Sequence, residues 1–156
     1  MVFCPDVGAE NHTQTRGGGG GSLARVLKLV LPKGSLERAT LELFEAADLP
    51  VQRSSSVDYQ ATIDDPRIES VRILRPQEIP TYVSEGLFDL GITGRDWVAE
   101  TGSVVESLGE LKYSKNTSRP IRMVVAVAGD SPAESVKDLP DGVRVQTEYL
   151  ESTRRF

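Results

Sequence analysis

The sequence has little that could cross-link the chain or hold a metal ion. Its 156 residues include one cysteine, Cys4, and one histidine, His12. A single cysteine excludes an intrachain disulfide, and one cysteine with one histidine cannot supply the four ligands of a zinc site. We therefore predict no metal site built from cysteine and histidine, and we assign no function to either residue.

Long apolar runs and an excess of positive charge are missing as well. No apolar stretch approaches the ~18 residues that span a bilayer, and the first 25 residues lack the cationic and apolar segments of a secretory signal. The formal net charge is −5 at pH 7, which argues against a nucleic-acid surface. These absences predict a cytoplasmic protein with no membrane and no nucleic-acid partner.

The N-terminal segment is expected to have no fold. Residues 1–25 show neither helical nor strand periodicity, and the glycine tract at 17–21 has the composition of a flexible linker. A glycine run binds phosphate only where a strand delivers it and a helix receives it, and neither is visible here. We predict a disordered Gly-rich extension over residues 1–25.

Two strand–helix units predict an α/β fold. Residues 26–31 form a nearly continuous apolar run, as in a parallel strand that is covered on both faces. Ser35 is placed to cap a helix that continues to Asp48. Residues 88–93 are a second buried-strand candidate, and a helix at about 95–100 follows them.

The segments between and after these units complete the expected topology. Residues 59–63 and 70–74 are predicted to form a hairpin, and 77–85 a helix with Pro80 in its first turn. The polar connector that ends in Pro120 places a lobe boundary at about residue 117. The resulting division is a first lobe over 26–117 and the start of a second lobe over 118–156. The remaining predicted elements are strands at 104–108, 121–128 and 144–147, a short helix at 135–139, and a helix that begins before Phe156.

Ligands of open α/β sheets bind beyond the carboxyl ends of the strands, where loops lead into helix N-termini. Lys33 and Gly34 follow the first strand. Glycine permits close backbone approach, the helix start offers unpaired N–H groups, and the lysine adds a compact positive charge. This turn is a candidate phosphate site; a solvated surface lysine is the alternative.

A second turn, Thr93-Gly94-Arg95-Asp96, offers a hydroxyl, an accessible backbone, a guanidinium and a carboxylate. Such a set suits a nucleotide, although a helix whose first turn is stabilised by Asp96 would show the same residues. Arg75 would emerge at the same sheet edge if residues 70–74 run parallel to the other strands. Its alternative is a surface salt bridge.

Taken together, these segments resemble the ATP phosphoribosyltransferase family. The matching pieces are LPKGSL at 31–36, ILRPQEIP at 73–80, EGLFDLGITGRD at 85–96 and, more loosely, residues 144–155. They occur in order from Val26 to the last residue. Short pieces such as DLGITG also suit other two-lobed binding proteins, but the ordered set is characteristic.

The resemblance implies a fold and a reaction. The fold is the type II periplasmic-binding-protein-like pair of α/β lobes, here with the first lobe complete and the second partial. In the reaction, which opens histidine biosynthesis, N1 of ATP's adenine displaces pyrophosphate from C1 of phosphoribosyl pyrophosphate in the presence of Mg²⁺. This chemistry depends on positioning rather than on a protein nucleophile, so no catalytic residue is named. A homo-oligomer or a regulatory subunit is implied for the full-length protein.

Carried over by position, the resemblance assigns roles to residues at both turns. Lys33, with Gly34, would contact ligand phosphates. The nucleotide pocket would be lined by Arg75, Gly94, Arg95, Asp96 and Trp97. For Trp97 the alternative is core packing, because the family often has an aliphatic residue there.

Two departures from the family bear on activity. The acidic, glycine-containing loop that binds phosphoribosyl pyrophosphate does not occur before Phe156, and Leu150 stands where the family usually has proline. We therefore predict that the 156-residue chain does not turn over. The alternatives are a non-catalytic two-lobed small-molecule-binding module or an inactive fragment, while a DNA-binding regulator is disfavoured by the acidic charge and the lack of a helix-turn-helix.

Overall fold

A computed structural model describes residues 2–4, 26–111 and 122–156. The chain divides into two units, Met1–Ser114 and Lys115–Phe156. The expected lobe boundary at residue 117 lies outside the described residues.

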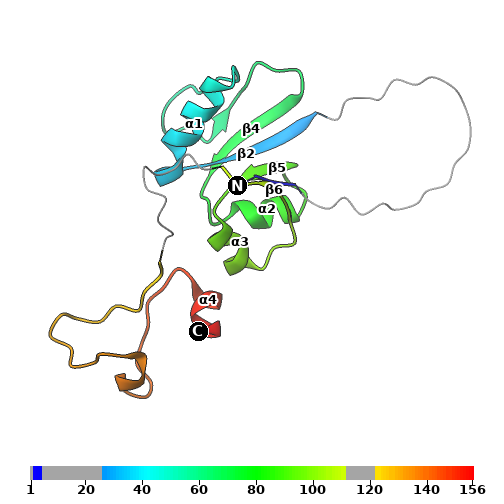
Figure 1. Ribbon diagram of the computed structural model, residues 1–156. Coiled ribbons are helices and arrows are strands. Elements are labelled where there is room, and N and C mark those ends of the chain that lie inside the picture. The colour runs from blue at the N-terminus through cyan, green and yellow to red at the C-terminus, as the bar shows by residue number, and fades with distance from the viewer. Residues whose placement is uncertain (1, 5–25, 112–121) are drawn as a thin grey trace, which may run out of the picture. The chain divides into compact units, whose positions relative to one another are not determined.

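The first unit is built on a six-stranded mixed sheet with the strand order β3-β4-β2-β5-β1-β6 (Figure 1). Its central strand, β2 (Leu27–Pro32), pairs in parallel with β4 (Ile68–Leu74) on one side and with β5 (Leu90–Ile92) on the other. At one end of the sheet, β3 (Gln60–Ala61) pairs antiparallel with β4. The predicted parallel strands and the predicted hairpin are thus confirmed.

The other end of the sheet contains a strand that was not expected. β1 (Val2–Cys4) lies between β5 and β6 (Glu106–Gly109) and pairs antiparallel with both. The expectation of no regular structure before Arg25 is therefore wrong for these three residues. So short a run shows no period of its own, and its strand conformation comes from pairing with β5 and β6. The glycine tract at 17–21 lies outside the described residues.

Helices cover both faces of the sheet. A 3₁₀ turn, η1 (Gly34–Leu36), leads into α1 (Glu37–Ala46), and further along the chain come α2 (Ile79–Ser84) and α3 (Arg95–Thr101). The predicted cap at Ser35 is wrong, because the 3₁₀ turn moves the start of α1 to Glu37, and among the described residues no side chain caps this start. Gly102, in the left-handed conformation at φ 63°, ends α3.

The alternation of side chains along β2 divides the core in two. Leu29 and Leu31 point to the face on which Phe44 of α1 packs, whereas Val30 packs with Ile79 and Val83 of α2 on the other face. Since successive side chains of a strand point to opposite faces, a continuous apolar run is what a strand covered on both faces requires.

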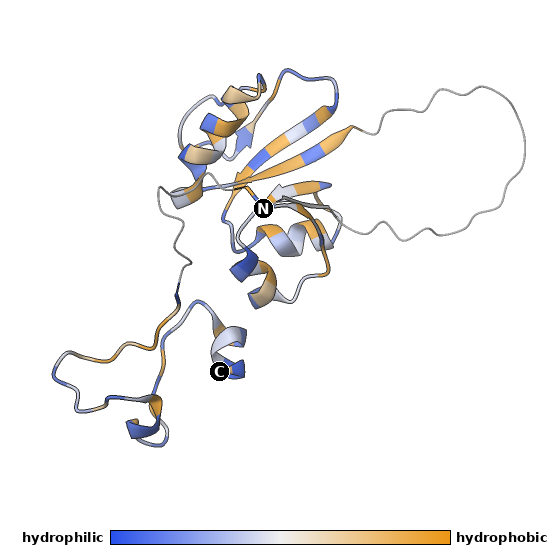
Figure 2. Ribbon diagram, viewed as in Figure 1, coloured by the Kyte–Doolittle hydropathy of each residue, from blue (hydrophilic) through white to orange (hydrophobic). Residues whose placement is uncertain are grey.

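The second unit contains two short helical elements, η2 (Val136–Asp138) and α4 (Leu150–Arg155). The predicted strands at 121–128 and 144–147 are wrong: residues 122–128 and 144–147 belong to no strand or helix and pair with no strand in the described part of the chain. Valines along them, Val124 and Val145 for example, are more than half exposed, and Figure 2 shows the apolar stretch after residue 122. A strand needs a hydrogen-bonding partner, whatever its apolar pattern.

No helix within the described ranges is both long enough and apolar enough to cross a membrane.

Candidate functional site

Three strand ends meet at one edge of the sheet in the first unit. Pro32 of β2 lies beside Leu74 of β4, and the backbone N–H of Lys33 donates to the Leu74 carbonyl at 2.7 Å. Because β4 runs parallel to β2, Arg75 emerges next to Lys33. The expectation that Arg75 would reach this edge if its strand were parallel is thereby confirmed.

β5 brings the second turn to the same edge from the other side of β2. The buried hydroxyl of Thr93, just after β5, donates to the carbonyl of Pro76 at 2.7 Å. Pro76 follows Arg75 directly, so this bond ties the turn after β4 to the turn after β5. Nearby, Oε1 of Gln77 is buried and has no hydrogen-bond partner among the described residues.

The Lys33 side chain lies against an aromatic ring. Its Nζ is 4.1 Å from the centroid of the Tyr59 ring, a distance at which the ring quadrupole attracts a cation. Lys33 is half-buried, and its ammonium forms no ion pair with a described carboxylate. Within the described ranges, the lysine thus contacts an aromatic ring and not a carboxylate.

Gly34 adopts a backbone conformation that favours glycine. Its φ is 82°, and no described atom would lie within 4 Å of an added Cβ, so conformation rather than space selects glycine here. The Gly34 N–H donates to Oε2 of Glu37 at 3.2 Å. This N–H was expected to be unpaired and available to a phosphate; in the structure a carboxylate accepts from it.

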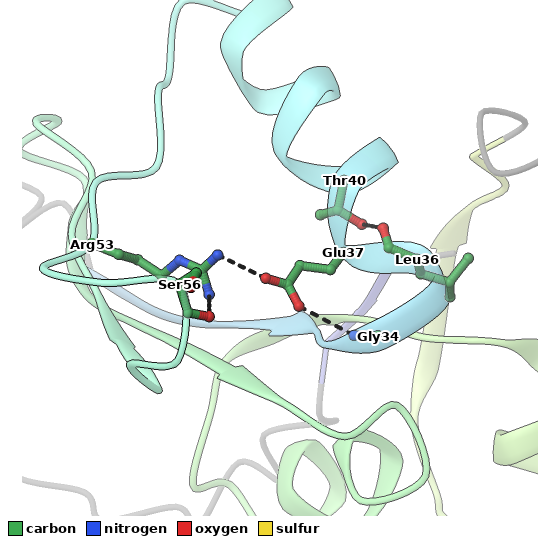
Figure 3. A network of polar contacts seen from close by, with 6 residues as sticks. All are labelled: Gly34, Leu36, Glu37, Thr40, Arg53 and Ser56. Atoms are coloured by element: carbon green, nitrogen blue, oxygen red, sulfur yellow. Dashed lines mark hydrogen bonds and ion pairs between the residues drawn. The ribbon is translucent and has the colours of Figure 1, made fainter.

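Glu37 belongs to a polar network that anchors the Lys33–Gly34 turn (Figure 3). Its Oε1 accepts from Nη2 of Arg53 at 2.7 Å, and Nη1 of Arg53 donates to the carbonyl of Ser56 at 3.2 Å. The side chains of Arg53 and Glu37 are only 13% and 19% exposed, so this ion pair is screened less than a surface pair. Arg53 thus connects the loop before β3 to the start of α1.

The loop before β3 has a polar turn of its own. The hydroxyl of Ser54 donates to the carboxylate of Asp58, and the backbone N–H of Gln60 donates to the same carboxylate at 2.9 Å. The Ser54 hydrogen bond is the main cause that holds the pKa of Asp58 below its ordinary value. Sequence reasoning missed this loop, Arg53 included, because no motif or period marks it.

At the second turn, the exposed side chain of Asp96 occupies the space beside Gly94. An added Cβ would collide with the Asp96 carboxylate and lie 3.5 Å from Cδ1 of Trp97. Asp96 therefore folds back toward the helix start, where it stands in the first turn of α3. Trp97 is half-buried. This geometry is compatible both with a stabilised helix start and with a nucleotide site.

The two predicted arginines differ in their partners. Nη1 of Arg95 lies 2.7 Å from Oε1 of Glu110, and both side chains are more than half exposed. Arg75 is exposed, and its guanidinium has no partner in the described part of the chain. The structure therefore places Lys33, Gly34, Arg75 and Gly94 at one edge, with Arg95 engaged in a surface ion pair.

Comparison with known proteins identifies the family. The sequence model described as "HisG: ATP phosphoribosyltransferase" matches residues 75–156, more than half of the chain. The chain belongs to this family. Of the motifs that suggested it, EGLFDLGITGRD lies within the matched region and ILRPQEIP overlaps it, whereas LPKGSL at 31–36 precedes it.

Curated relatives extend the match toward the N-terminus. An ATP phosphoribosyltransferase from Chlorobium phaeovibrioides is 46% identical over 132 residues, covering 85% of this chain and 44% of the relative. One from Nitratidesulfovibrio vulgaris is 44% identical over 135 residues, covering 86% of this chain and 45% of the relative. The chain thus spans less than half the length of these relatives.

A solved structure also matches in part. The ATP phosphoribosyl transferase (HisG:HisZ) complex from Thermotoga maritima is 29% identical, with a TM-score of 0.42, and the match covers 51% of this chain and 37% of that one. The mixed α/β architecture is established by the sheet and its helices.

Proposed function

We propose that the first unit is the nucleotide-binding lobe of an ATP phosphoribosyltransferase and that ATP binds at the carboxyl edge of β4, β2 and β5. The observation that carries this proposal is the parallel pairing of the three strands, which brings Lys33, Arg75 and Gly94 to one edge in a chain of this family. Edges of this kind are where open α/β sheets bind their ligands.

Positive charge at this edge suits a polyphosphate. Lys33 and Arg75 have no carboxylate partner among the described residues, so both charges are available to an anionic ligand. Phosphate oxygens accept strong hydrogen bonds from ammonium and guanidinium groups. We assign the Lys33 ammonium to the phosphates, and Gly34 to their close approach to the backbone, because the Gly34 N–H already donates to Glu37. We assign Arg75, Gly94, Arg95, Asp96 and Trp97 to the rest of the nucleotide.

The reaction follows from the family. N1 of the adenine ring would attack C1 of phosphoribosyl pyrophosphate, the bond from C1 to the pyrophosphate oxygen would break, and pyrophosphate would leave with the bonding electrons. The protein's contribution is to align the two polyanions and to stabilise the departing pyrophosphate. The finer fold that we propose is the type II periplasmic-binding-protein-like fold of two α/β lobes.

Mg²⁺ would accompany the substrate phosphates. The ion usually keeps several waters and binds through one or two carboxylates together with phosphate oxygens. Asp96, an exposed carboxylate at the β5–α3 turn, fits this role, and the ion would supply charge neutralisation. For the full-length protein we propose a homo-oligomer or a complex with a regulatory subunit, located in the cytoplasm.

Arg75→Ala tests the placement of the pocket. Loss of a charge-assisted contact should weaken ATP binding by about 1.5–3 kcal/mol, roughly ten- to a hundredfold, in calorimetry with Mg²⁺. Arg67→Ala is the matched control, because Arg67 precedes β4 and lies at the opposite end of the same strand. Equal affinities for wild type and Arg75→Ala would refute the proposed pocket.

Turnover is tested separately. We propose that the 156-residue chain alone is inactive, because the resemblance places the loop that binds phosphoribosyl pyrophosphate in a segment that these residues do not include. A pyrophosphate-release assay with both substrates should then detect activity only in a chimera extended with the corresponding segment of a complete relative. Robust turnover by the 156-residue chain would contradict this proposal.

A further inference from the structure

Tyr59 is the residue at this edge whose role the family assignment leaves open. It directly precedes β3, the residue is 51% exposed, and Nζ of Lys33 lies 4.1 Å from the centroid of its ring. The two residues are 26 positions apart in sequence. The hairpin brings the tyrosine to the strand end where Lys33 emerges.

The backbone fixes the place of the ring. The carbonyl of Tyr59 accepts from the N–H of Ile73 at 3.0 Å, which continues the pairing of β3 with β4 toward the carboxyl edge. Further back, Gln52 and Thr62 exchange two backbone hydrogen bonds of 2.8 and 2.9 Å. Both flanks of the loop are thus anchored to the sheet.

A second contact from the same loop supports the same turn. Arg53 pairs with Glu37, and Glu37 accepts from the N–H of Gly34. The loop before β3 therefore supports the Lys33–Gly34 turn in two ways: Tyr59 contacts the lysine side chain directly, and Arg53 binds the Glu37 carboxylate that accepts from the Gly34 backbone. Figure 3 shows the second of these contacts.

We infer that Tyr59 is a positioning residue, whose ring holds the Lys33 ammonium at the sheet edge for a phosphate oxygen of the bound nucleotide. This inference rests on the proposed function of the edge. A free lysine side chain samples many rotamers, and ordering it on binding reduces affinity. A ring on one side of the ammonium restricts the side chain beforehand and leaves N–H donors for the ligand.

A neutral aromatic partner suits this task better than a carboxylate would. A carboxylate would neutralise the lysine and compete with the phosphate for its N–H groups. The face of a tyrosine ring attracts the cation, and the net positive charge remains. Lys33 keeps that charge because no described carboxylate pairs with it.

The test is a double-mutant cycle on the full chain, with ATP and Mg²⁺ as the titrant. Tyr59→Leu should weaken binding roughly two- to fivefold, which corresponds to the worth of an exposed cation–π contact. Tyr59→Phe keeps the ring and should restore most of the affinity. Val57→Ala, at a 72% exposed position in the same loop, controls for disturbance of the loop.

The cycle separates positioning from general loop structure. If Tyr59 acts through Lys33, then Tyr59→Leu should have no further effect in a Lys33→Ala background, whereas a merely structural role would add to it. If Tyr59→Leu reduced the affinity for ATP equally in the wild-type and Lys33→Ala chains, or if it increased the affinity, the inference would be overturned.

A readout without ligand complements the cycle. Protons on Cε of Lys33 should show an upfield ring-current shift in NMR spectra, present in wild type and Tyr59→Phe and absent in Tyr59→Leu. Absence of the shift in wild type refutes the Lys33–Tyr59 contact, and the inference with it. Absence of ATP binding by wild type refutes both the proposed function and the inference. A loss confined to Lys33→Ala, with Tyr59→Leu unchanged, refutes the inference alone.

Discussion

Gly91, the glycine in the middle of DLGITG, gives the most direct test of the described packing. It lies in β5, beside Val30 of β2 and beneath α2. A Cβ added to Gly91 would be 2.7 Å from Cγ2 of Ile79 and 3.0 Å from both Cγ1 of Val30 and Cγ2 of Val83. All three neighbours are fully buried, so none can swing into solvent to make room.

The expected cost of Gly91→Ala follows from these contacts. Inserting a methyl group into a closely packed core costs about 1–3 kcal/mol of unfolding free energy. The loss of a glycine from the unfolded chain offsets this by ~0.4–1 kcal/mol. Gly109→Ala in β6 also removes a glycine from the unfolded chain, but it causes no overpacking, because no described atom lies within 4 Å of its added Cβ. The two variants should therefore differ by about 1–3 kcal/mol.

Urea unfolding measures this difference. The single tryptophan, Trp97 in α3, reports the first unit by fluorescence, and circular dichroism gives an independent probe. With a common slope, the shift in midpoint converts directly into a change in the free energy of unfolding. If Gly91→Ala and Gly109→Ala unfold within ~0.3 kcal/mol of each other, then α2 does not pack on β5 as described.

Two further predictions concern polar contacts. Thr93→Val keeps the shape of the side chain but leaves the Pro76 carbonyl without its donor, and should lower the free energy of unfolding by about 1–3 kcal/mol in the same urea assay; an unchanged midpoint would contradict the buried hydrogen bond. Hydrogen bonds from the Arg67 side chain and backbone lower the pKa of Asp65 to about 2. Because the pKa of Asp65 is lower in the folded than in the unfolded chain, ionised Asp65 stabilises the fold above about pH 4. This stabilisation is lost as the pH falls toward about 2. In an NMR titration Arg67→Gln should raise the Asp65 midpoint, and an unmoved midpoint would exclude the arginine as the cause.

The central strands could be predicted because their signal is local. The continuous apolar run of β2 predicts a buried parallel strand by itself, because a strand that is covered on both faces needs apolar side chains on both. Once β4 was placed parallel to it, the position of Arg75 followed from topology. The segments at 122–128 and 144–147 have a similar apolar pattern but pair with no strand in the described part of the chain. An apolar pattern therefore indicates a preference for a strand, and a partner strand is needed to form one.

The contacts that shape the site could not be predicted in this way. Arg53 pairs with Glu37, which lies 16 residues earlier in the chain. Tyr59, just before β3, contacts Lys33, just after β2. No periodicity or motif marks either contact in the sequence. The positions of these loop side chains depend on backbone pairing between the ends of the loop and segments that are distant in sequence. Glu37 stands in the first turn of α1, and no pattern in the sequence predicts that its carboxylate accepts a hydrogen bond from the N–H of Gly34.

The ion pairs show which cations at the edge are already paired with a carboxylate, which the sequence alone did not show. Arg53 is paired with Glu37, and Arg95 with Glu110, so an incoming polyphosphate would have to compete with a carboxylate for either guanidinium. Lys33 and Arg75 face no such competitor among the described residues. In a chain with a net charge of −5, the attraction of a polyanion must come from local cations that remain unneutralised. Arg75→Ala is therefore a sharper test of the pocket than Arg95→Ala, because replacing Arg95 would remove a cation whose charge Glu110 already balances.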